Sequence, residues 1–242
     1  MLLWLVFPAV KLFHELGHAF AVKVWGGEVH EMGLMMLAFA PLPYVEASSS
    51  AAFPEKRKRV IVAAAGIMVE LFLASLALIV WVNVEPGQVK AIAYNVILIG
   101  GISTLIFNGN PLLRFDGYYI LSDLIEIPNL AQRSKGYLGY LFKKYCLSIE
   151  SQSPVTAEGE QGWFVFYGIG SFIYRIFILI ALALFVSSKF FVIGVAIAIW
   201  GLTTQLVIPF IKNCFGLWNS LAGRRRQGRI AAFAAVFSAL LV

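Results

Sequence analysis

Long apolar runs separated by shorter polar stretches dominate the pattern of the chain. A helix needs about 20 apolar residues to cross a bilayer, and five runs reach this length. They cover about residues 2–25, 60–83, 91–110, 163–186 and 190–211. A sixth run begins at Ile230 and stops at Val242, so we expect this last helix to be truncated. The pattern predicts an all-α polytopic membrane protein with five to six transmembrane helices.

The composition supports the same fold class. The 242 residues are 60% hydrophobic and 13% charged, whereas about 25% of the residues in a soluble domain are charged. The net charge of +6 is compatible with nucleic-acid binding, but the basic residues cluster beside apolar runs, where they act as topology signals. We therefore expect the lipid bilayer as a partner, and no nucleic acid.

The segment between the first two runs has a different character. Residues 29–39 are β-prone, and the prolines at 41, 43 and 54 would break any helix. We therefore expect a short interfacial β-sheet or re-entrant flap after the first helix. Later in the chain, residues 118–125 are typical of a short helix, and residues 137–145 of an amphipathic surface segment.

The whole chain, residues 1–242, is expected to form a single membrane-embedded domain. Its core would occupy residues 1–135, followed by a cytoplasmic amphipathic linker over residues 136–161 and accessory helices over residues 162–242. Basic residues are concentrated in alternate loops, which predicts that these loops are cytoplasmic and that the first span starts outside. The basic residues in these loops include Lys56, Arg57, Lys58, Arg59, Arg133, Lys135, Lys143, Lys144, Lys212 and Arg224.

The first run contains the motif "HELGH", with His14, Glu15 and His18. Ionisable groups at membrane depth are costly, so they usually serve a function or are paired. Histidines four residues apart share one face of a helix, so both imidazoles could bind one zinc ion. Glu15 is then positioned as the general base toward a zinc-activated water. The alternative is that the histidines are buried helix residues bonded to their neighbours.

A catalytic zinc site needs three protein ligands, and "FNGNPLLRFDGYYILSD" over residues 107–123 offers Asp116 as the third. The sequence from Asn108 to Pro111 predicts unwound backbone, which is tolerated at membrane depth where it lines a polar cavity. The side chains of Asn108 and Asn110 could hold an extended peptide there. Taken alone, the pair Asp116-Gly117 is also typical of an ordinary turn.

The two segments together resemble the site-2 protease family of intramembrane zinc metalloproteases. The resemblance depends on "HELGH" and on an Asn-x-x-Pro-x-x-x-x-Asp-Gly pattern at Asn108, Pro111, Asp116 and Gly117. The longer stretch "NPLLRFDGYYILSDLIEIPNL" is similar to a bacterial branch of peptide zinc metalloproteases. The resemblance covers roughly residues 10–135.

The resemblance implies roles for particular residues. His14, His18 and Asp116 would bind Zn²⁺, Glu15 would be the catalytic base and acid, and Asn108 would contribute to substrate or oxyanion binding. It also implies a metalloendopeptidase in the bacterial inner membrane that hydrolyses a membrane-embedded or membrane-associated peptide, with export or secretion proteins as further partners.

One element departs from the family pattern. The family often has Ala-Gly-Pro-x-x-Asn between the two motifs, whereas this chain has "AGIMVE", with Ile67 and Glu70. Glu70 could be a rival third ligand, a partner of a histidine's free N–H, or a protonated buried acid. Two other functions stay open: a component of a peptide export assembly that is non-catalytic or has lost catalysis, and a zinc hydrolase that acts on lipid or another small substrate in the bilayer.

Overall fold

The computed structural model describes residues 2–37, 40–146 and 152–212. Among these residues, five helices are long and apolar enough to cross a membrane, which confirms the predicted fold class. Their bounds are Leu2–Val24, Lys56–Asn83, Gln88–Asn108, Glu160–Ser187 and Phe191–Lys212. The predicted sixth run, from Ile230, lies outside the described residues. The chain is therefore an integral membrane protein.

The chain divides into two compact units, Met1–Pro128 and Asn129–Val242. Every residue that the sequence predicts for the site belongs to the first unit. Part of the predicted linker, residues 147–151, lies outside the described residues. The division into core, linker and accessory helices stays a prediction.

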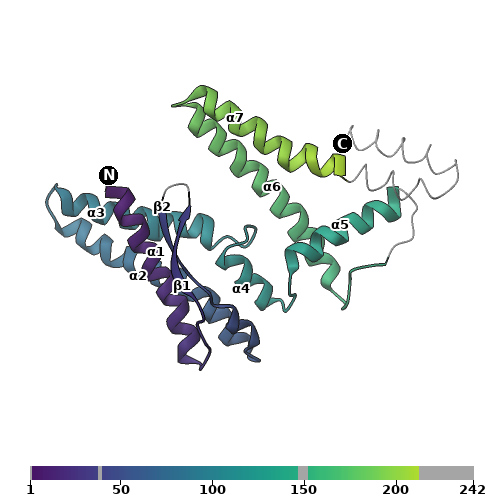
Figure 1. Ribbon diagram of the computed structural model, residues 1–242, viewed down its shortest axis with the longest axis horizontal. Helices are drawn as coiled ribbons and strands as arrows, with labels where there is room; N and C mark the ends of the chain where they lie inside the picture. The colour runs from purple at the N-terminus through teal and green to yellow at the C-terminus, as the bar shows by residue number, and fades with distance from the viewer. Residues whose placement is uncertain (1, 38–39, 147–151, 213–242) are drawn as a thin grey trace. The chain divides into compact units, whose positions relative to one another are not determined.

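Helices form most of the first unit (Figure 1). Its helices are α1 (Leu2–Val24), the short 3-10 helix η1 (Ser48–Ala52), α2 (Lys56–Asn83), α3 (Gln88–Ile97), the π-helix η2 (Leu98–Asn108) and α4 (Asp116–Leu124). α3 and η2 form one continuous span. At its end the N–H of Gly109 donates to the carbonyl of Thr104 at 2.8 Å, the five-residue spacing of a π-helix. The span thus ends at the predicted break, and α4 starts at Asp116.

The predicted flap is a β-hairpin. Strands β1 (Met32–Leu37) and β2 (Ala40–Val45) pair antiparallel, with Met32 opposite Val45 and Leu37 opposite Ala40. The sequence predicted a short sheet or re-entrant flap but identified β-prone residues only around the first strand, and β2 contains Pro41 and Pro43. Proline is tolerated here since each strand of a two-stranded sheet is an edge strand. β2 lies beside α1, which places the hairpin next to the "HELGH" motif.

Small residues allow the helices of the first unit to approach one another closely. A Cβ atom on Gly17 of α1 would lie 3.0 Å from the carbonyl oxygen of Ala65 in α2. A Cβ atom on Gly100 of η2 would lie 2.7 Å from the carbonyl oxygen of Glu70, also in α2. Membrane helices associate through such close packing, because lipid supplies no hydrophobic drive between them. α2 therefore contacts both α1 and η2 at backbone distance.

The second unit contains α5 (Leu130–Cys146), α6 (Glu160–Ser187), α7 (Phe191–Leu202) and the π-helix η3 (Thr203–Val207). Arg133 of α5 binds Glu160 of α6 with both terminal nitrogens, at 2.7 and 2.6 Å. The backbone N–H of Thr156 also donates to Glu160 at 2.8 Å. These contacts attach the start of α6 to α5.

Two neighbouring glycines of η2 provide a matched test of the helix packing. We expect Gly100→Ala to destabilise the protein by about 1–3 kcal/mol, because the new methyl group meets the backbone of α2. Gly101→Ala should cause no loss, since its Cβ would meet only the Cβ of Ala74 at 3.7 Å. Thermal unfolding in detergent measures both variants. Equal melting temperatures would contradict this account of the packing.

Candidate metal centre

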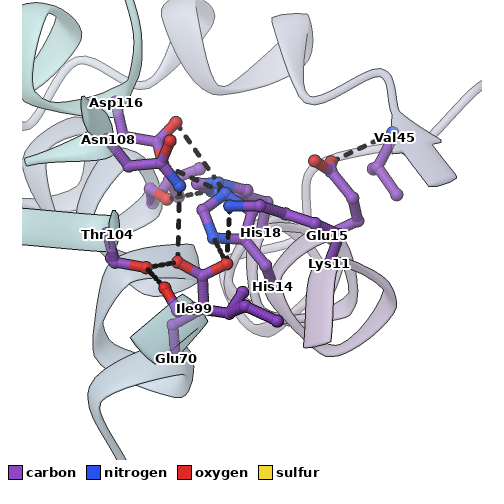
Figure 2. A network of polar contacts seen from close by, with 11 residues as sticks. Lys11, His14, Glu15, His18, Val45, Glu70, Ile99, Thr104, Asn108 and Asp116 are labelled. Atoms are coloured by element: carbon purple, nitrogen blue, oxygen red, sulfur yellow. Dashed lines mark hydrogen bonds and ion pairs between the residues drawn. The ribbon is translucent and has the colours of Figure 1, made fainter. Parts of the chain in front are cut away.

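The three predicted metal ligands lie together inside the first unit (Figure 2). His14 and His18 are buried on α1, and Asp116 is the first residue of α4. The two Nε2 atoms lie 3.1 Å apart. Nε2 of His14 is 3.0 Å from Oδ2 of Asp116, and Nε2 of His18 is 3.5 Å from Oδ1. These three side chains could hold one metal ion.

The two imidazoles have the spacing of ligands to one ion. Two ligand atoms at about 2.0–2.1 Å from a tetrahedral ion lie about 3.3–3.4 Å from each other, and the two Nε2 atoms, 3.1 Å apart, are close to that value. Each imidazole contacts a different oxygen of Asp116. Oδ2 of Asp116 is buried and has no hydrogen-bond partner among the described residues. A Cβ atom on Gly66 of α2 would lie 2.5 Å from Nε2 of both histidines. Glycine at this position therefore leaves room for the imidazoles.

A polar group lies behind each imidazole, and the one behind His18 makes a hydrogen bond. Nδ1 of His18 lies 2.8 Å from the carbonyl oxygen of Val62, so Nδ1 carries the hydrogen and donates it. Nε2 of His18 faces the carboxylate of Asp116, 3.5 Å from Oδ1. Nδ1 of His14 lies 3.3 Å from Oε1 of Glu70, within ion-pair distance but without hydrogen-bond alignment. A metal-binding histidine commonly has such a carbonyl or carboxylate behind it.

Asp116 is the first residue of α4, outside the membrane-spanning helices. Burial acts to raise the pKa of its carboxyl, but the contacts with His14 and His18 outweigh burial and hold the pKa well below its usual range. The ionised form is the one that binds a metal ion.

Glu15 points in a different direction from the two histidines. Its carboxylate accepts a hydrogen bond of 3.2 Å from the N–H of Val45, at the end of β2. Figure 2 shows the carboxylate turned toward Val45 and away from Asp116. Adjacent residues of a helix point about 100° apart, which explains why Glu15 faces the hairpin while His14 faces α2. The role of Glu15 as catalytic base stays a prediction.

The two predicted substrate residues have different surroundings. Nδ2 of Asn108 donates to Oε2 of Glu70 at 3.3 Å, and Glu70 in turn contacts His14, one of the predicted metal ligands. Oδ1 of Asn110 accepts a hydrogen bond of 2.8 Å from the N–H of Leu112, two residues further on. Such a bond stabilises a local turn. Contact of either asparagine with a substrate stays a prediction.

Sequence reasoning missed two members of this polar cluster. Nζ of Lys11 donates to Glu70 at 2.7 Å, and the hydroxyl of Thr104 donates to the other oxygen of the same carboxylate. Lys11 had a usable signal, since it is a charged residue inside an apolar run one helical turn before His14. Thr104 had none, because nothing in its local sequence distinguishes it. Of the three interpretations of Glu70, its position against Nδ1 of His14 favours the partner of a histidine.

Substitution of each proposed ligand tests the metal centre. We expect purified wild-type protein to retain about one zinc ion per chain, and His14→Ala, His18→Ala and Asp116→Ala each to lose it, because two protein ligands are too few. His30→Ala is the control, since the third histidine is an exposed residue outside this cluster. Elemental analysis of protein purified in detergent measures the zinc. Zinc retained by the His14 and His18 variants would place the ion elsewhere.

Comparison with known proteins adds no assignment. No protein-family model matches the chain, and neither a curated protein nor a solved structure does. The interpretation of this site therefore depends on its geometry. Two imidazoles and a carboxylate come from segments far apart in the sequence, and their donor atoms lie within 4.8 Å of one another.

Proposed function

We propose that the chain is an intramembrane zinc metalloendopeptidase of the site-2 protease type. It hydrolyses a peptide bond in a membrane-embedded or membrane-associated peptide. One observation carries the proposal: the donor atoms of His14, His18 and Asp116 meet in the interior of a membrane-helix bundle. Three polar side chains would not gather in such a place without a strong interaction to offset their desolvation.

The donor set suits zinc. His14 and His18 would bind the ion with nitrogen and Asp116 with oxygen, a combination of donors that catalytic zinc sites use. Bound zinc supplies two effects: it polarises the scissile carbonyl and lowers the pKa of water to about 7. Three protein ligands, and not four, are typical of catalytic zinc sites.

Glu15 would move the protons in this mechanism. Its carboxylate accepts a proton from the attacking water and later donates it to the leaving amine. In the structure the carboxylate is bonded to the N–H of Val45. Glu15 must therefore exchange this bond for the water, through rotation of its own side chain or displacement of β2.

The hairpin offers a surface for an extended substrate. Met32, Leu34 and Met36 alternate along β1 and are 58%, 71% and 70% exposed. A two-stranded sheet has free edges, so a peptide can add to it as a further strand while apolar side chains lie against the methionines. An extended substrate also exposes its carbonyl groups, which a helix would engage in its own hydrogen bonds. We propose that the substrate binds unwound along this hairpin.

The proposed location is the bacterial inner membrane. The basic residues Lys56, Arg57, Lys58 and Arg59 at the start of α2 would lie in the cytoplasm. The metal centre would then occupy the cytoplasmic half of the bilayer, from which water reaches it. The expected partners are bilayer lipid and the peptide substrate, together with export or secretion proteins that deliver the peptide.

A second candidate function is favoured by the orientation of Glu15. A protein that keeps the metal fold and handles peptides for export without cutting them needs no general base. The bond between Glu15 and Val45 gives the carboxylate a structural task, that of attaching the hairpin to α1. Activity measurements on Glu15 variants separate the two candidates.

Glu15→Gln tests catalysis apart from metal binding. We expect the variant to cleave membrane peptides about 10²–10⁴-fold more slowly, because the amide cannot accept the proton, and to retain wild-type zinc. The assay uses protein reconstituted in lipid vesicles, with a set of single-span peptides that contain helix-breaking residues. Mass spectrometry identifies the products, and elemental analysis measures the zinc.

Glu28→Gln is the control for this experiment. Glu28 carries the same functional group, lies beyond the end of the same helix, and is 76% exposed. The Glu28→Gln variant should cleave the peptides at the wild-type rate. Peptides handled equally by wild type and Glu15→Gln would sink the protease proposal and support the non-catalytic export component.

A further inference from the structure

Glu70 of α2 is the most connected buried carboxylate of the first unit. Its side chain is 0% exposed. Oε1 lies 2.7 Å from Nζ of Lys11 and 3.3 Å from Nδ1 of His14, both on α1. Oε2 accepts hydrogen bonds from the hydroxyl of Thr104 and, at 3.3 Å, from Nδ2 of Asn108, both on η2. Figure 2 shows the carboxylate of Glu70 between the side chains from α1 and those from η2.

The two oxygens of Glu70 therefore have separate partners. One faces the helix that carries the histidines, and the other faces the span that leads to Asp116. Lys11 supplies the opposite charge, without which a buried carboxylate would be strongly unfavourable. Thr104 and Asn108 satisfy the second oxygen, so the carboxylate as a whole has partners on both sides.

The packing around Glu70 restricts its movement. Its backbone carbonyl lies against Gly100, where a Cβ atom would come within 2.7 Å. The hydroxyl of Thr104 also lies 2.9 Å from the carbonyl oxygen of Ile99, which fixes Thr104 within the π-helix. η2 thus holds both the backbone and the carboxylate of Glu70, and it does so from the same face.

Glu70 faces one of the two ring nitrogens of His14, at 3.3 Å and without a hydrogen bond. A neutral imidazole has one N–H and one lone pair. A carboxylate facing Nδ1 favours the tautomer in which Nδ1 holds the hydrogen, and Nε2 is then free to bind an ion. Val62 does the same for His18 through its carbonyl oxygen. His14 is the ligand whose outer partner is charged.

We propose that Glu70 is the positioning residue of the metal centre. It orients His14 through Nδ1 and holds η2 through Thr104 and Asn108, so that the imidazole and the carboxylate of Asp116 reach the ion from fixed positions. Glu70 does not itself bind the ion. This role depends on the proposed metal centre.

Zinc affinity and a cobalt spectrum together test this role. We expect Glu70→Gln to bind zinc about 10–100-fold more weakly, the usual effect of removing an outer partner of a ligand. The visible spectrum of the Co²⁺-substituted protein should also change, because it reports ligand geometry. A chromophoric chelator in competition with detergent-purified protein gives the affinity.

Two further variants separate positioning from folding. Glu70→Gln leaves Lys11 without its counter-ion, so the double variant Lys11→Met with Glu70→Gln removes both charges together. It should fold and still bind zinc about 10–100-fold more weakly. The matched control is Glu160→Gln, which removes a buried carboxylate paired with Arg133 in the other unit. It should lower the melting temperature and leave zinc affinity and the cobalt spectrum unchanged.

The outcomes distinguish this role from the metal centre itself. Wild-type zinc affinity and an unchanged cobalt spectrum in the folded double variant would overturn the positioning role and leave the metal centre intact. A wild-type protein that binds neither zinc nor cobalt would overturn the metal centre, and the positioning role with it. Weaker binding with an altered spectrum supports both.

Discussion

The first unit depends on the mutual satisfaction of polar side chains inside an apolar helix bundle. Lys11, His14, Glu70 and Asp116 would each be costly in lipid, and each lies against another member of the group. The members come from α1, α2 and α4, so α1 and α2 must pack together to pair Lys11 with Glu70, and α4 must join them to bring Asp116 to the histidines. Polar contacts of this kind select one arrangement of the helices from the many that apolar packing would allow.

Glycine makes that arrangement possible. Gly66 leaves space for both imidazoles against α2, and Gly100 allows η2 to reach the backbone of Glu70. Larger residues at these positions would hold the helices apart and separate the donor atoms. The helix packing and the polar cluster therefore depend on each other, because close contact between the helices sets the distances between the polar side chains.

The hairpin is connected to the same chemistry through α1. The helix presents His14 toward Glu70 and Asp116, and Glu15 toward β2, because consecutive residues face different directions. A peptide that displaces β2 would release the carboxylate of Glu15 next to the proposed ion. In the proposed mechanism, a single hydrogen bond at Val45 would thus link substrate binding to the availability of Glu15 as base.

The sequence by itself determined the spans, the flap after the first helix, and the three residues whose donor atoms meet. Run length and the spacing of His14 and His18 are local properties, and a helix preserves them whatever surrounds it. Only the tertiary structure decided that Pro41 and Pro43 lie in a strand, that Leu98–Asn108 is a π-helix, and that Glu70 faces Lys11, His14 and Thr104. These features depend on which helix faces lie together, and that is settled by close packing between segments distant in the chain.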